Sequence, residues 1–141
     1  MKALITTDGS EFSLAALRAF IARLHWFAET PEISVMTVHP SVPYGGAASW
    51  AGKDAVGHYY DEEMSNALAP ALAILAEHKL AGAVIKKIGD PSHEIIKHAK
   101  EWGAEMIIMG THGHSGVVTL LMGSVAQKVL ASTTIPVLLL K

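Results

Sequence analysis

Short apolar stretches alternate along the chain with segments whose hydrophobic residues recur at helical spacing. Five of these stretches are almost continuously aliphatic, as buried strands of a parallel sheet are. They predict strands at residues 2–7, 33–38, 83–88, 105–110 and 135–141. Strands that alternate with helical patterns in this way are typical of an α/β protein.

Helical patterns follow the strands, and capping residues mark several of their ends. Leucine and isoleucine recur at helical spacing after the first strand, at Leu14, Leu17, Ile21 and Leu24. Ser10 precedes this pattern and Asp90 precedes the third helical pattern, and both residue types are favourable N-caps. Gly103 is a suitable end for the third helix. Residues 124–132 carry the last helical pattern before the closing strand.

The segment between the second and third strands divides into a predicted loop and a long predicted helix. Residues 39–57 contain two prolines and four glycines, which predicts a long, mobile loop. Residues 58–82 carry a helical pattern with Gly82 as its expected end. Pro70 lies inside that pattern, so we expect it to kink the helix or to split it in two.

Together the elements predict a doubly wound three-layer sandwich, in which helices cover both faces of a five-stranded parallel sheet. The chain has 141 residues, which fits a single domain over residues 1–141. No internal repeat and no second domain are visible in the pattern.

The composition excludes several classes of protein. Half of the residues are hydrophobic and 17% are charged, as in a well-filled globular domain. The net charge is −2 and lysines and arginines do not cluster, so nucleic-acid binding is not expected. There is no cysteine, and the longest apolar run, residues 67–76, is too short for a membrane span. We therefore expect a cytoplasmic protein without a membrane partner.

Residues 110–124, GTHGHSGVVTLLMGS, contain four glycines and follow the fourth predicted strand. Glycine lets backbone N–H groups approach an anion closely, and a helix N-terminus such as the one at Ser124 attracts phosphate. The Ser124 hydroxyl adds a donor. The stretch therefore indicates a phosphate-binding loop, and the alternative is a flexible loop whose glycines only permit turns. No lysine or arginine lies between Lys100 and Lys128, so this loop is better suited to holding a polyphosphate than to cleaving one.

Asp8 follows the first strand, where a ligand would bind in an open sheet. Its carboxylate could hold Mg²⁺ against phosphates or accept a hydrogen bond from a ribose hydroxyl, and it could also serve only the turn. His112 or His114 could contact phosphate. His93 and His98 are five residues apart on a helix, a spacing that does not share one face, so a zinc site is not favoured.

Several motifs resemble the nucleotide-binding branch of the universal stress protein family. Gly110-x2-Gly113-x9-Gly123-Ser124 matches the branch's G-x2-G-x9-G-[ST] pattern, and TTDGSEFSLAAL near the start is similar to the end of the family's first strand. GDPSHEIIKHAKEWGAEMIIMGTHG and IPVLLL are similar to its third helix and closing strand. The resemblance covers the chain except residues 40–57.

The resemblance implies a five-stranded sheet of order 3-2-1-4-5 that binds ATP, or AMP or ADP, with Mg²⁺ possible. Asp8 would lie near ribose and metal, and Val38, Met109 and Gly110 would surround adenine and ribose. Phosphates would meet N–H groups of Gly113, Gly123, Ser124 and Val125, flanked by Thr7 and Ala126. Residue 112, often arginine in the family, is His112 here. A homodimer through the last strand, residues 136–140, is also implied, and an exposed edge strand of that kind favours pairing.

The function this predicts is a nucleotide-binding stress-response protein, a switch with little or no hydrolysis and no catalytic residue. Two alternatives stay open. One is a slow Mg²⁺-dependent ATPase or phosphotransferase that uses Asp8, and the other is a protein-interaction module that binds no nucleotide.

Overall fold

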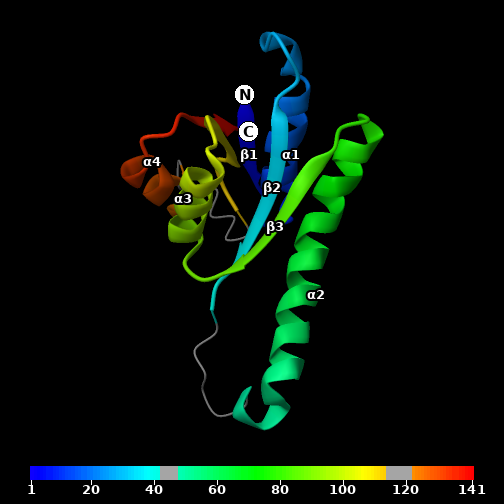
Figure 1. Cartoon of the computed structure of the whole chain (residues 1–141), viewed down its shortest axis with the longest axis vertical. Coiled ribbons are helices and arrows are strands. Elements are labelled where there is room, and N and C mark those ends of the chain that lie inside the picture. The colour runs from blue at the N-terminus through cyan, green and yellow to red at the C-terminus, as the bar shows by residue number, and fades with distance from the viewer. Residues whose placement is uncertain (42–47, 114–121) are drawn as a thin grey trace.

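The computed structural model describes residues 1–41, 48–113 and 122–141. In these residues five strands form one parallel sheet of order β3-β2-β1-β4-β5 (Figure 1). The strands are β1 (Lys2–Thr6), β2 (Glu32–His39), β3 (Gly82–Ile88), β4 (Met106–Gly110) and β5 (Val137–Leu140). The predicted α/β class, the doubly wound sheet and its order are confirmed.

Four α-helices connect the strands, with capping as the sequence predicted. They are α1 (Glu11–Ile21), α2 (Ala48–Glu77), α3 (Pro91–Trp102) and α4 (Ser124–Ser132). The side chains of Ser10 and Asp90 accept hydrogen bonds from backbone N–H groups and cap α1 and α3. Gly103 ends α3 in the left-handed conformation, at φ 74°. A short 3₁₀ helix, η1 (Leu24–Trp26), follows α1, so Leu24 lies outside the first helix.

The expected loop over residues 39–57 is wrong for its second half. Helix α2 begins at Ala48, so residues 48–57 are helical in backbone except at Gly52, where the helix kinks, and residues 42–47 lie outside the described residues. Alanine is frequent in this segment and is the best helix former. Among the glycines of this segment, Gly52 does interrupt the helix locally, with a backbone at φ 78° and ψ 156°.

The expected split of the helix at Pro70 is also wrong. Helix α2 keeps helical geometry through Pro70, and Gly82 starts β3 rather than ending the helix. Proline costs an interior helix about 3 kcal/mol. On both sides of Pro70 the helix buries apolar side chains against the sheet, at Leu68, Ala71 and Leu75. This burial offsets the local cost, at roughly 1.5–3 kcal/mol for each large aliphatic side chain.

Two hydrophobic cores cover the two faces of the sheet. Side chains alternate along each strand, so the neighbours Leu4 and Ile5 of β1 enter opposite cores. The core with Ile5 packs under α1 and α2, and includes Phe20, which is fully buried. The core with Leu4 packs under α3 and α4, and includes Ile95 and Val129. The helices cover the two faces of the sheet, and the carboxyl ends of the central strands β1, β2 and β4 lead into the connecting turns.

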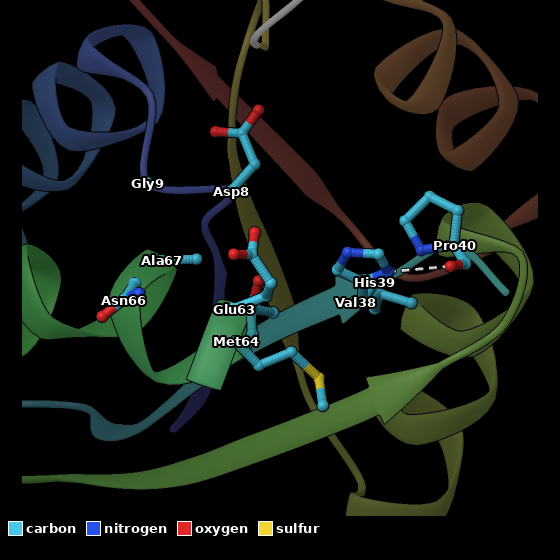
Figure 2. A pocket seen from close by; sticks show the side chains of 10 residues that line it. Asp8, Gly9, Val38, His39, Pro40, Glu63, Met64, Asn66 and Ala67 are labelled. Carbon is cyan, nitrogen blue, oxygen red and sulfur yellow. Dashed lines mark hydrogen bonds between the residues drawn. The ribbon is translucent and has the colours of Figure 1, made fainter. Parts of the chain in front are cut away.

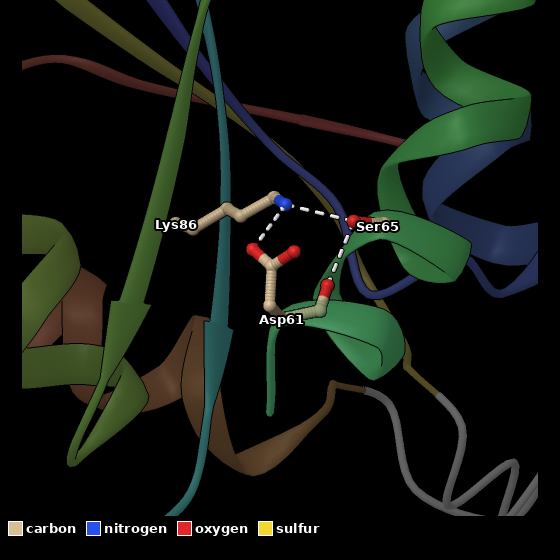
Figure 3. Close-up of polar contacts among 3 residues, drawn as sticks. All are labelled: Asp61, Ser65 and Lys86. Carbon is tan, nitrogen blue, oxygen red and sulfur yellow. Dashed lines mark hydrogen bonds and ion pairs between the residues drawn. The ribbon is translucent and has the colours of Figure 1, made fainter. Parts of the chain in front are cut away.

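A polar cluster fastens α2 to the edge strand β3 (Figure 3). The Lys86 ammonium donates to Asp61 Oδ1 and to Ser65 Oγ, each at 2.7 Å. The hydrogen bond and the charge of Lys86 lower the pKa of the Asp61 carboxyl.

The helices within the described residues lack the combined length and hydrophobicity that a membrane-spanning segment requires.

Candidate functional site

A cavity of about 400 Å³ opens at the carboxyl ends of β1, β2 and β4, beside the first turns of α3 and α4. Strand order reverses around β1, and this is where doubly wound sheets bind their ligands. The volume falls in the usual range of small-molecule sites. Eleven residues that the sequence singled out as ligand-binding line this one cavity: Thr7, Asp8, Val38, Met109, Gly110, His112, Gly113, Gly123, Ser124, Val125 and Ala126.

The turn between β1 and α1 fixes the orientation of Asp8. Its Oδ1 accepts hydrogen bonds from the backbone N–H of Ser10 at 3.0 Å and from the Ser10 hydroxyl at 2.6 Å. The Thr7 hydroxyl accepts from the backbone N–H of Gly9 at 3.1 Å and lies 2.9 Å from the Ser13 hydroxyl. Asp8 therefore serves the turn, as one reading of the sequence expected, and also lines the cavity.

Gly113 lies directly against the Asp8 carboxylate. A Cβ atom built on Gly113 would lie 2.6 Å from Asp8 Oδ2, far inside van der Waals contact. A side chain at residue 113 therefore cannot coexist with the present position of Asp8. The first glycine of the motif has a similar constraint, because a Cβ on Gly110 would lie 3.0 Å from the backbone oxygen of Phe12.

The second end of the glycine motif begins helix α4. The Gly123 N–H donates to the Thr111 carbonyl at 2.7 Å, which joins the start of α4 to the end of β4. Residues 114–121, including His114, lie outside the described residues. Gly123 is the N-cap of α4 and has no side chain to cap the helix. The first N–H groups of α4 can therefore serve an anion in the cavity, where Ser124, Val125 and Ala126 lie.

No lysine or arginine is among the described residues that line the cavity. The nearby Lys128 on α4 faces a carboxylate instead, with its ammonium 3.9 Å from Asp90 Oδ2. Hydrogen bonds from the Ser92 hydroxyl and the His93 N–H, with a smaller contribution from Lys128, lower the pKa of Asp90. Among the described lining residues, the positive potential therefore comes from backbone N–H groups.

The histidines do not form a metal centre in the part of the chain that is described. There, no three His, Asp or Glu side chains converge to hold a metal ion. His112 Nδ1 lies 3.0 Å from the Thr111 hydroxyl, and its ring lies 5.5 Å from that of Phe12. His98 stacks on Trp102, and burial lowers its pKa, with a further contribution from Lys87.

The cavity is also lined by seven residues that were not predicted from the sequence. Met36 lies two residues before Val38 on the same face of β2, so strand alternation could have identified it. Pro91 and Ile95 come from α3, and their position depends on which face of the sheet that helix covers. The remaining four are Thr6, Ser13, Pro40 and Thr111.

The family model described as the universal stress protein family matches residues 1–141. Universal stress protein YxiE of Bacillus subtilis is 32% identical over 148 residues, which cover 99% of this chain and 98% of YxiE. Universal stress protein MJ0531 of Methanocaldococcus jannaschii is 33% identical over 141 residues, which cover 99% of this chain and 81% of that protein.

Solved structures share the fold over nearly the whole chain. The structure of MJ0577 from Methanocaldococcus jannaschii has a TM-score of 0.83 at 27% identity, covering 99% of this chain and 94% of that one. A universal stress protein from Archaeoglobus fulgidus in complex with dAMP has a TM-score of 0.64 at 21% identity, with coverage of 100% and 98%. An Arabidopsis thaliana family protein with AMP bound has a TM-score of 0.66 at 17% identity, with coverage of 100% and 91%.

Proposed function

The chain belongs to the universal stress protein family, and on that premise we propose that its strand-end cavity binds an adenine nucleotide. The observation that carries the proposal is that eleven residues selected from the sequence line one cavity. The complexes of family members with dAMP and AMP support the same ligand class.

The two ends of the cavity suit the two ends of a nucleotide. Met36, Val38, Ile95 and Met109 supply an apolar wall on which a purine base can pack. Gly113 and the first turn of α4 supply backbone N–H donors for phosphates. The N–H of Gly123, which the sequence also assigned to phosphate, instead donates to the Thr111 carbonyl. Asp8 Oδ2, which lies against Gly113, is suited to accept a hydrogen bond from a ribose hydroxyl.

A magnesium ion fits the site in a limited way. Asp8 is a single carboxylate, and no cluster of three acidic or histidine side chains is found within the described residues. Mg²⁺ is often held by one or two carboxylates together with substrate phosphates and water. Asp8 would hold the ion in this manner, and the ion would neutralise phosphate charge.

We further propose that the protein acts as a nucleotide-dependent stress-response switch with little or no hydrolysis. Phosphoryl transfer depends on cations that stabilise the charge developing on the phosphate. The described lining contributes no lysine or arginine for this purpose. Binding can then change the state of the protein without consuming the nucleotide. A slow Mg²⁺-dependent ATPase that uses Asp8 is the second candidate.

Calorimetric titration with ATP, ADP and AMP tests the proposal. We expect saturable binding of at least one of them, with a stoichiometry of one per chain and fewer than one hydrolysed per minute. Repeated turnover that disappears in Asp8→Asn would favour the enzyme. No heat of binding at millimolar concentrations of all three nucleotides would contradict the proposal and leave a protein-interaction module.

The edge position of β5 supports a homodimer as a further part of this proposal. Strand β5 pairs with β4 along one side, and its other side is the edge of the sheet. All four of its residues are half-buried in the single chain. A second copy that paired along this edge would cover an apolar strand that is otherwise prone to aggregation.

A further inference from the structure

A second cavity, of about 410 Å³, lies at the carboxyl end of β2 on the side of the sheet that α2 covers (Figure 2). It shares Asp8, Val38 and Pro40 with the first cavity, and its far wall comes from Glu63 and Asn66 of α2. Figure 2 shows the Glu63 carboxylate directed toward the β1–α1 turn. The proposed nucleotide site does not use this wall.

The charged side chains that line this cavity accept hydrogen bonds. Glu63 and Asp8 contribute carboxylates, and no lysine or arginine occurs in the described lining. His39 Nδ1 lies 2.8 Å from the Pro40 carbonyl. A carbonyl can only accept, so Nδ1 is the donor in this contact. The cavity is therefore suited to a ligand that donates hydrogen bonds and carries positive charge.

Two further polar groups in the cavity wall can accept a hydrogen bond from a ligand. Thr37 is 4% exposed and lines the cavity. Its hydroxyl oxygen is not among the fully enclosed polar atoms of the described residues, so a ligand in the cavity can donate to it. Pro70 has no N–H, so the carbonyl of Asn66 lacks its regular helical donor.

The geometry of α2 keeps these groups in place. A Cβ on Gly9 would lie 3.0 Å from the Ala67 Cα, so the β1–α1 turn and α2 are in close backbone contact here. The hydrogen bonds of Lys86 to Asp61 and Ser65 fasten the same part of α2 to β3. One wall of the cavity is therefore formed by two backbone segments in close contact, at Gly9 and Ala67.

We propose that this second cavity binds a small aliphatic ammonium ion. The ammonium group has three donors, with Glu63 as its counter-charge and the Thr37 hydroxyl as an acceptor. The side chains of Val38, Met64 and Ala67 form an apolar wall for the alkyl chain. A bare metal ion fits less well, since no group of three His, Asp or Glu ligands occurs in the described residues.

The test is NMR titration of the ¹⁵N-labelled full chain with 1,4-diaminobutane at constant ionic strength, with 1-butanol as the neutral probe. We expect saturable shifts around Thr37 and Glu63 with the diamine and none with the alcohol. The Glu63→Gln variant should bind at least about tenfold more weakly, since a charge-assisted hydrogen bond is lost. Thr37→Val, which keeps the shape of the side chain, should bind several-fold more weakly.

Glu62→Gln is the matched control. Glu62 is the neighbouring acid on α2, is exposed and does not belong to the cavity lining. It carries the same change of charge, so its affinity for the diamine should stay within twofold of wild type. Equal losses in Glu62→Gln and Glu63→Gln would mean nonspecific attraction to an acidic helix and would overturn the proposal. The absence of saturable diamine shifts in the wild-type chain at millimolar concentration would overturn it as well.

Discussion

We expect the replacement of Gly113 by valine to reduce the affinity for ATP by about 100-fold or more. A loss of this size corresponds to two backbone hydrogen bonds to a charged phosphate group. The Cβ alone would lie 2.6 Å from Asp8 Oδ2. Asp8 cannot simply rotate away, because Ser10 donates two hydrogen bonds to its other oxygen. Either Asp8 is displaced or residue 113 moves, and both changes disrupt the same cavity. Calorimetric titration of the variant with ATP measures the effect.

Gly123→Ala is a matched control for Gly113→Ala. Both substitutions add one methyl group to a glycine of the same motif in the same cavity. A Cβ on Gly123 would have its nearest neighbour at 3.4 Å, an ordinary contact, and the N-cap φ of −68° suits any residue. Gly113→Ala should therefore weaken ATP binding clearly more than Gly123→Ala. Wild-type affinity in Gly113→Val would rule out this geometry for the nucleotide site.

Local chemistry explains which parts of the fold could be predicted. The central strands β1, β2 and β4 were recognisable because a buried parallel strand is apolar on both faces, as Leu4 and Ile5 illustrate. Asp90 and Gly103 act at the ends of their own helix, so a few residues of sequence contain the whole signal. The strand order was different, because it came from the resemblance to a family and not from the pattern.

Helix α2 shows where local signals fail. Proline and glycine preferences amount to about 1–3 kcal/mol, and packing over a long helix exceeds them. Pro70 is tolerated because Leu68 and Ala71 beside it are buried in the core. A sequence pattern does not contain this compensation, since it depends on contacts between α2 and strands distant along the chain.

The part of the candidate site that lies at strand ends and in the glycine motif could be predicted from the sequence. Pro91 and Ile95 reach the same cavity from α3, and their contribution follows from the packing of a helix across the sheet. The second cavity carries no sequence signal of its own. It exists because α2 extends past the end of β2 and Gly9 touches the backbone at Ala67.

We expect Gly9→Ala to lower the free energy of unfolding by about 3 kcal/mol, which combines a strained backbone with an overpacked contact. Gly9 has a φ of 78°, a conformation that disfavours any side chain. A Cβ would also lie 3.0 Å from the Cα and 3.1 Å from the carbonyl oxygen of Ala67. These are backbone atoms of α2, so the clash cannot be relieved by a rotamer change. Urea denaturation followed by circular dichroism measures the loss.

Gly103→Ala separates the two causes. Gly103 has nearly the same φ, 74°, and a Cβ there would meet no atom within 4 Å. This variant carries the backbone strain alone and should lose about 1 kcal/mol. The difference between the two variants, about 2 kcal/mol, then measures the contact between the β1–α1 turn and α2. Equal losses would mean that α2 yields at Ala67, and that the wall of the second cavity is less rigid than the close contact implies.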